Sequence, residues 1–370
     1  MDLATVFCPN LDCPARGQTG QGNIGQHSRK EQRWICKQCG KTFTATKGTA
    51  FYRLRTPAET VSLVLTLLAH GCPLQAIVVA FGFDERTVAA WLARAGRQAQ
   101  AVQEHWVEQP RALGQVQADE IRVKQQGKIS WMALAMTVST RLWLAGEVSE
   151  QRDLGLVRRL LARVRRCAAR APLLFCTDGF RAYPRAIRET FRDPLPMGMP
   201  GRPHLRPWTH LGIAQVVKHY VHRRVASVER RIVAGTAAQV EKLRRCSQGG
   251  PGVLNTAYIE RLNATFRERL AALTRRGRAL ARKCSTLEYG MYLIGAVYNF
   301  CTAHESLRVA ATVSQPTVDR TPAMAARITT HCWSVRELLS CHVPPPRWTP
   351  PIQRGRRSRT LQRLIERWCL

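Results

Sequence analysis

The chain has 370 residues, of which 45% are apolar, so it can bury a sizeable core and wholesale disorder is excluded. Its 57 Lys and Arg residues outnumber 25 Asp and Glu residues, which gives a formal net charge of +32. A surplus of this size predicts a polyanionic partner, and nucleic acid is the obvious one. Ordinary contents of Gly and Pro exclude collagen-like and low-complexity chains.

The first residues carry neither a basic stretch nor an apolar one, so they do not resemble a secretory signal. Residues 60–83 lack Asp, Glu, Lys and Arg, but His70, Gly71 and Pro73 interrupt them. We therefore predict short soluble helices there rather than a membrane span. The expected location is cytoplasmic and nucleoid-associated, with no membrane partner.

Four cysteines near the amino terminus form two closely spaced pairs. Four residues separate Cys8 from Cys13, and two separate Cys36 from Cys39. The segment between the pairs is polar and Gly-rich, so it cannot bury a core of its own. Four thiolates on two turns match the tetrahedral demand of one structural Zn²⁺. We predict a zinc ribbon over residues 1–50; the alternative is four unrelated thiols or a labile disulfide pair.

Residues 51–110 have the pattern of three helices. Thr56 and Pro57 are start signals for the first helix, Gly71 ends it, and Asp84 is a natural N-cap for the third. A Gly-containing turn before the last of three short helices is typical of a helix-turn-helix DNA-binding domain. An ordinary three-helix packing unit is the alternative. The residues expected to meet DNA lie off the apolar face of the third helix: Arg86, Thr87 and Arg94.

Residues 111–310 change from helical to alternating periodicity and predict a catalytic domain. We expect strands at 115–124, 129–138 and 142–148, a helix at 153–169 and a further strand at 173–177. This order indicates a ribonuclease-H-like mixed α/β sheet in which the first and fourth strands are neighbours. Asp119 and Asp178 would then lie together, whereas Glu120 would point to the opposite face of its strand.

A later helix that Asn255 can cap offers a third acid. Glu260 lies off its apolar stripe, with Asn263 and Arg267 on the same face. Three converging carboxylates can hold two divalent cations, and oxygen ligands select Mg²⁺ or Mn²⁺. Arg267 would meet a phosphate. The alternative is that these acids are unrelated surface residues, since a chain with 25 acids yields many triples.

Three further segments are basic. Residues 194–252 are predicted to be an insertion in the catalytic domain, with a β-hairpin on the DNA path. Residues 311–370 form a Pro-rich basic carboxyl-terminal tail with a short helix from Leu361. The densest basic run follows the Glu260 helix, and its members are expected to contact DNA phosphates: Arg275, Arg276 and Arg278. The whole chain is thus predicted to be an α+β multidomain protein.

Several motifs resemble those of bacterial insertion-sequence transposases. The matching stretches are QRWICKQCGKTF at 32–43, CTDGFRAY at 176–183, NTAYIERLN at 255–263, YNFCTAHESL at 298–307 and TPAMA at 321–325. Over residues 8–345 the chain is similar to the insertion-sequence-one (IS-one) family and its relatives.

The resemblance implies DDE chemistry on double-stranded DNA. Such a transposase binds the terminal inverted repeats of its element, cleaves a strand with divalent metal and transfers the freed end into target DNA. Joining two ends implies a homodimer or higher assembly. Two alternatives remain open, namely a catalytically silent DNA-binding regulator and a ribonuclease-H-like nuclease without strand transfer.

Overall fold

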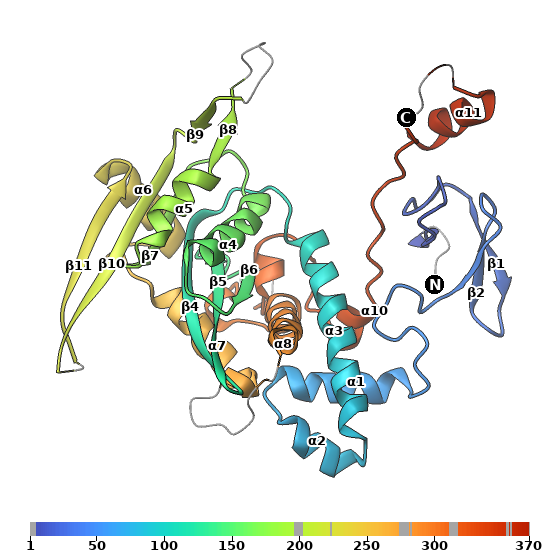
Figure 1. Cartoon of the computed structure of the whole chain (residues 1–370), viewed down its shortest axis with the longest axis horizontal. Helices are drawn as coiled ribbons and strands as arrows, with labels where there is room; N and C mark the ends of the chain where they lie inside the picture. The colour runs from blue at the N-terminus through green and yellow to red at the C-terminus, as the bar shows by residue number, and fades with distance from the viewer. Residues whose placement is uncertain are drawn as a thin grey trace. The chain divides into compact units, whose positions relative to one another are not determined.

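The computed structural model describes residues 5–195, 203–222, 224–273, 281, 283–310, 317–352, 355 and 357–369 (Figure 1). It divides into two compact units. The first combines Met1–Ala58 with Leu339–Leu370, and the second is Glu59–Leu338. The basic run of Arg275, Arg276 and Arg278 lies outside the described residues.

The first unit is built on a small antiparallel sheet. Its strands are β1 (Ile24–Ser28), β2 (Arg33–Cys36) and β3 (Thr42–Thr44), in that order. Alternation along β2 and β3 buries Trp34 and Phe43, because successive side chains point to opposite faces. These rings pack with the four paired cysteines in one small core.

The carboxyl-terminal segment belongs to the same unit. Helix α11 (Arg359–Trp368) buries Trp368 in the cysteine-lined core, and the Gln18 Nε2 amide donates to the Trp368 carbonyl at 3.0 Å. The Arg16 guanidinium donates to the Pro346 carbonyl at 2.8 Å. This arrangement differs from the free tail that composition predicts, because the last helix carries an apolar stripe that the small ribbon core can bury.

Three helices begin the second unit: α1 (Ala58–Ala69), α2 (Leu74–Phe81) and α3 (Glu85–Trp106). Gly82 ends α2 with a φ of 67°, and the Asp84 carboxylate caps α3 by accepting the backbone N–H of Arg86 at 2.8 Å. The third helix is far longer than the short one that its first apolar residues indicate. Its small buried residues continue to Val102, which lets it pack against α8 (Cys284–Ala296).

A six-stranded mixed sheet forms the core of this unit, in the order β11-β10-β7-β4-β5-β6. Strands β4 (Gly114–Gln125), β5 (Lys128–Thr137) and β6 (Trp143–Ser149) are antiparallel, and β7 (Leu173–Asp178) runs parallel to β4. The predicted strand order and the neighbouring first and fourth strands are therefore confirmed, and the sheet is consistent with a ribonuclease-H-like domain.

The hairpin expected in residues 194–252 consists of β10 (Leu211–Val221) and β11 (Arg224–Ala234). Its first strand is also part of the central sheet, because the buried residues from Leu211 to Val216 pair in parallel with β7. The sequence did not indicate this double role. Beyond the Val216–Asp178 pair, the hairpin continues past the end of β7, first with the half-buried Val217 and Lys218 and then with exposed residues.

Helices cover both faces of the sheet. On one face α4 (Leu154–Cys167) packs against α5 (Ala182–Thr190), and on the other α7 (Ala257–Arg269) lies on β4. The remaining elements are short or peripheral: β8 (Arg192–Pro194), β9 (Leu205–Pro207), α6 (Ala237–Gln248), α9 (Pro322–Ala325) and α10 (Val335–Ser340). Within the described part of the chain, no helix has the length and apolar character needed to cross a membrane.

Candidate active site and metal-binding clusters

The four predicted zinc ligands converge in the first unit. Cys8 and Cys39 bring their Sγ atoms to 3.8 Å, and the Sγ atoms of Cys13 and Cys36 are also 3.8 Å apart. All four sulfur atoms lie within 4.8 Å of one another. Zn–S bonds of about 2.3 Å in a tetrahedron place sulfur atoms about 3.8 Å apart. The cluster therefore has the spacing of a tetrathiolate zinc site.

The thiols of this cluster differ in their surroundings. Burial raises the pKa of Cys13 to about 12. Burial opposes ionisation of Cys39 too, but hydrogen bonds from the Lys41 backbone and the Asn10 side chain lower its pKa to about 7. A bound cation would offset the cost of burying several thiolates together, and the donor set suits Zn²⁺.

The two predicted aspartates meet at the ends of adjacent strands. Asp178 is the last residue of β7, and the Ala118–Thr177 pairing of β4 with β7 puts Asp119 beside it. Their carboxylate oxygens fall within a group that spans at most 4.8 Å. The parallel register explains this juxtaposition, because it aligns the carboxyl end of β7 with the middle of the longer β4.

Glu260 lines the same pocket, whose volume is about 580 Å³, together with Asp119, Asp178 and Arg267. It lies in the first turn of α7. Its Oε1 atom accepts hydrogen bonds from the Thr256 hydroxyl at 2.7 Å and from Lys218 Nζ at 2.6 Å. The structure thus brings the three predicted acids and Arg267 into one hollow, with Glu260 held apart from the two aspartates by its own partners.

Glu120 joins the aspartates instead of standing apart from them. As expected, its neighbours lie on the α5 face, where Tyr183 is buried against it. Arg152 nevertheless links it to the site, because one guanidinium nitrogen donates to Glu120 Oε2 at 2.9 Å and to Asp178 Oδ2 at 3.2 Å. Glu120 therefore lies on the face expected for it, and Arg152 connects it to Asp178 around the end of β7.

Burial and mutual repulsion control the charge of this cluster. Burial is the main cause that raises the pKa of Asp119 to about 7, and the charges of Glu120 and Asp178 add to it. Burial also raises the pKa of Glu120. For Glu260 the effect of burial is outweighed by hydrogen bonds from Lys218 and Thr256, which lower its pKa. Buried acids that repel one another gain most from a divalent cation.

Further groups in the pocket fit such a cation. The Asn263 side-chain amide donates to Asp119 Oδ2 at 2.8 Å and fixes α7 against β4. Among the described residues that line the pocket, the buried Asn263 Oδ1 oxygen has no hydrogen-bond partner. Hard oxygen donors of this kind select Mg²⁺ or Mn²⁺ over softer metals.

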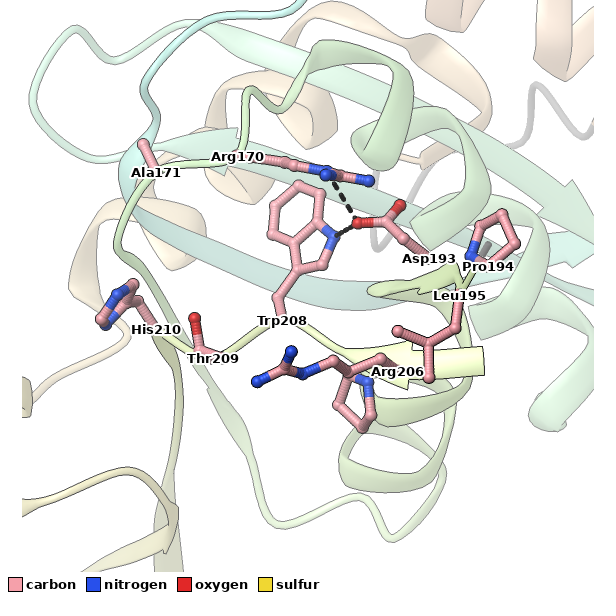
Figure 2. Close-up of a pocket in the computed structure, with 10 residues that line it drawn as sticks. Arg170, Ala171, Asp193, Pro194, Leu195, Arg206, Trp208, Thr209 and His210 are labelled. Carbon is pink, nitrogen blue, oxygen red and sulfur yellow. Dashed lines mark hydrogen bonds and ion pairs between the residues drawn. The ribbon is translucent and has the colours of Figure 1, made fainter. Parts of the chain in front are cut away.

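A separate pocket of about 490 Å³ lies at the opposite end of β7, near Arg170 and Trp208. Figure 2 shows the indole and the Arg170 guanidinium both directed at Asp193. Each of these contacts spans 2.8 Å, and Arg165 also pairs with this carboxylate. These three partners satisfy the Asp193 carboxylate and tie β8 to the loop that follows β9.

The three residues expected to meet DNA all lie on α3. Arg86 and Thr87 are exposed in its first turn, and Arg94 is half-buried two turns later. The apolar residues Val88 and Trp91 point into the helical bundle, as the spacing predicts.

A family model described as a DDE domain matches residues 114–202. The match supports an insertion-sequence DDE transposase, and such domains use divalent metals and act on DNA. It includes Asp119 and Asp178 but ends before Glu260 and Arg267. A search of curated proteins gave no match. The finer resemblance to the IS-one family stays a prediction.

Sequence reasoning missed two cationic side chains of the pocket. Lys218 reaches Glu260 from the part of β10 that extends beyond β7, and Arg152 reaches Asp178 from the loop before α4. Neither residue stands in a motif, because each position depends on strand register or on a loop. The CTDGF stretch at 176–180 marks the neighbourhood but not these partners.

Proposed function

We propose that this protein is a DDE transposase that binds the terminal inverted repeats of an insertion sequence and catalyses metal-dependent strand cleavage and strand transfer. The observation that carries the proposal is the convergence of Asp119 and Asp178, within a DDE-domain match, on a pocket that also contains Glu260. The same chain carries a net charge of +32, which favours binding to the polyanionic backbone of DNA.

In this proposal Asp119, Asp178 and Glu260 hold two Mg²⁺ or Mn²⁺ ions. When bound, such ions activate the attacking oxygen and stabilise the leaving oxygen of an in-line phosphoryl transfer. The protein itself contributes by holding the three acids in position. Asn263 fixes Asp119, Arg152 fixes Asp178, and Thr256 fixes Glu260 through the contacts described above. Arg267 supplies a cation to phosphate from the wall of the pocket.

DNA-end recognition is assigned to the zinc-binding ribbon and to the α2–α3 pair. Arg86, Thr87 and Arg94 are the proposed DNA contacts on α3. If Arg86 reads a base, Arg86→Ala costs roughly 1–3 kcal/mol and relaxes preference at one position. If Arg86 meets only phosphate, the slope of the logarithm of the binding constant against the logarithm of the salt concentration falls in magnitude by about one. Unchanged affinity and salt dependence would remove α3 from the DNA surface.

A strand-transfer assay tests the proposal directly. The substrates are an intact duplex that carries the DNA flanking this reading frame and the same duplex pre-cleaved to a 3′-hydroxyl end, and the target is a supercoiled plasmid. We expect Mg²⁺-dependent joining by the wild-type chain and none by Asp178→Asn. Cleavage without joining would indicate the nuclease alternative. Specific binding with neither activity would indicate the regulator. Joined products that contain two ends would support a dimer or higher assembly.

A further inference from the structure

The last helix of the chain has two different faces. Its apolar residues Leu361, Leu364, Ile365 and Trp368 follow helical spacing, and Trp368 is only 3% exposed in the cysteine-lined core. Ser358 caps the helix by accepting the Leu361 N–H at 3.2 Å. One face of α11 is therefore fixed to the ribbon by the same core that contains the four thiols.

Main-chain contacts support this attachment along the approach to the helix. A side chain at Gly17 would bring its Cβ to 2.7 Å from the Pro345 carbonyl, so the two segments touch through backbone. Arg16 donates to the Pro346 carbonyl, and Gln18 donates to the carbonyl of Trp368. Contacts at both ends of residues 345–368 give α11 a defined position on the ribbon.

The opposite face of α11 is polar and exposed. Its residues recur at the spacing of one helix face, and all are exposed: Arg359, Gln362, Arg363, Glu366 and Arg367. In the described part of the chain, no carboxylate lies within ion-pair distance of Arg359 or Arg363. Three guanidinium groups thus accompany a single acid on a face that the described residues of this unit leave exposed.

We propose that this face of α11 contacts double-stranded DNA and is the groove-reading element of the first unit. Three strands of three to five residues offer no helix of their own for a groove. A ten-residue helix is about 15 Å long and enters a major groove about 12 Å wide. Arg and Gln are the side chains that pair bidentately with guanine and adenine.

The charge of the face decides between classes of partner. An apolar helix face would indicate a protein groove, but Trp368 is buried in the ribbon core and Leu364 packs against that core. What remains exposed carries a net positive charge in a chain of +32, which favours a polyanion. The inference rests on the proposed function only in taking duplex DNA, rather than RNA, as that polyanion.

The test measures DNA affinity of the full chain and of Arg359→Ala/Arg363→Ala. The probes are a duplex from the flanks of this reading frame and a random-sequence duplex of equal length. We expect affinity for the flanking duplex to fall roughly 10- to 100-fold, and affinity for the random duplex to fall less. The matched control is Arg158→Ala/Arg185→Ala, which removes two exposed guanidinium groups that pair with Glu189.

Retention of zinc in the Arg359→Ala/Arg363→Ala variant checks that the first unit is folded. Affinity equal to that of the control variant, for both duplexes, would overturn the proposal. A change in oligomeric mass with unchanged DNA affinity would overturn it too and would assign the face to protein contact. Failure of the proposed function is distinguishable, because it appears in the strand-transfer assay, as no Mg²⁺-dependent joining by the wild-type chain or as joining that survives Asp178→Asn, whatever α11 does.

Discussion

At the scale of single residues, the three acids behave as one unit. Asp119→Asn, Asp178→Asn or Glu260→Gln keeps the size of the side chain but removes the charge that binds Mg²⁺. Each variant is expected to abolish cleavage and strand transfer, and combinations should lose no more than single variants. DNA-end binding should survive, because none of the proposed DNA contacts on α3 lines the pocket. An electrophoretic mobility assay run beside the strand-transfer assay separates the two effects.

Controls for this prediction follow from the contacts. Glu189→Gln removes a carboxylate on α5 that pairs only with surface guanidinium groups among the described residues, and it should leave activity intact. Glu120→Gln should reduce activity partially, because it removes the charge that pairs with Arg152, and Arg152 in turn positions Asp178. Full activity in all three acid variants would contradict the DDE mechanism.

The raised pKa of Asp119 predicts a dependence of stability on pH. Burial raises this pKa to about 7, above the value of about 4 in an unfolded chain. Between these values the folded state binds more protons, so metal-free protein loses stability as the pH rises from about 4 to about 7. In chelator at pH 8, Asp119→Asn should therefore melt at a higher temperature than wild type, and the difference should vanish near pH 4.

Thermal unfolding followed by circular dichroism checks this. Glu305→Gln, which removes an exposed carboxylate, is the control and should change the melting temperature little at either pH. A lower melting temperature for Asp119→Asn at pH 8 would mean that the ionised carboxylate is favourably paired in the folded chain.

At the scale of elements, the packing of α3 on α8 depends on Gly96. A Cβ added there would lie 2.5 Å from both Cα and Cβ of Tyr289. Helix propensity alone favours Gly96→Ala by about 1 kcal/mol. The contact is with backbone that cannot rotate away, so overpacking of about 1–3 kcal/mol should prevail and lower stability. Urea unfolding measures whether Gly96→Ala raises or lowers the free energy of unfolding. Ala90→Val, which enlarges an exposed side chain of the same helix, is the control.

Elements were predictable where local pattern decides them. A residue periodicity close to two indicated β4 to β6, and the apolar run ending at Asp178 indicated β7, so strand order alone brought Asp119 beside Asp178. The length of α3 could not be predicted in this way, because small residues such as Ala95 and Ala99 give a weak apolar signal. The place of Lys218 depends on the register of β10 with β7, which no local pattern encodes.

At the scale of the whole molecule, the chain joins its two ends in one unit. Composition indicated a Pro-rich tail after residue 310, but Trp368 is buried among cysteines that stand more than 300 positions earlier. No periodic signal links such distant segments, and only the small size of the ribbon core hints that it needs an external partner. The second unit has its own sheet and core, so the two are expected to lose structure independently.

Removal of zinc tests this independence. The four thiols and Trp368 share one small core, so extraction of one Zn²⁺ per chain should unfold the ribbon and release α11 together. The sheet of the second unit should keep its far-ultraviolet signal and its protection from proteolysis.

Limited proteolysis with and without a zinc chelator should cut within residues 5–58 and 341–369 only when zinc is absent. Cys13→Ser should reproduce the effect without chelator, whereas Cys72→Ser, a substitution in the second unit, should not. Purified protein that contains no stoichiometric zinc, or a chelator-treated chain that retains a protected α11, would show that the ribbon is held without metal.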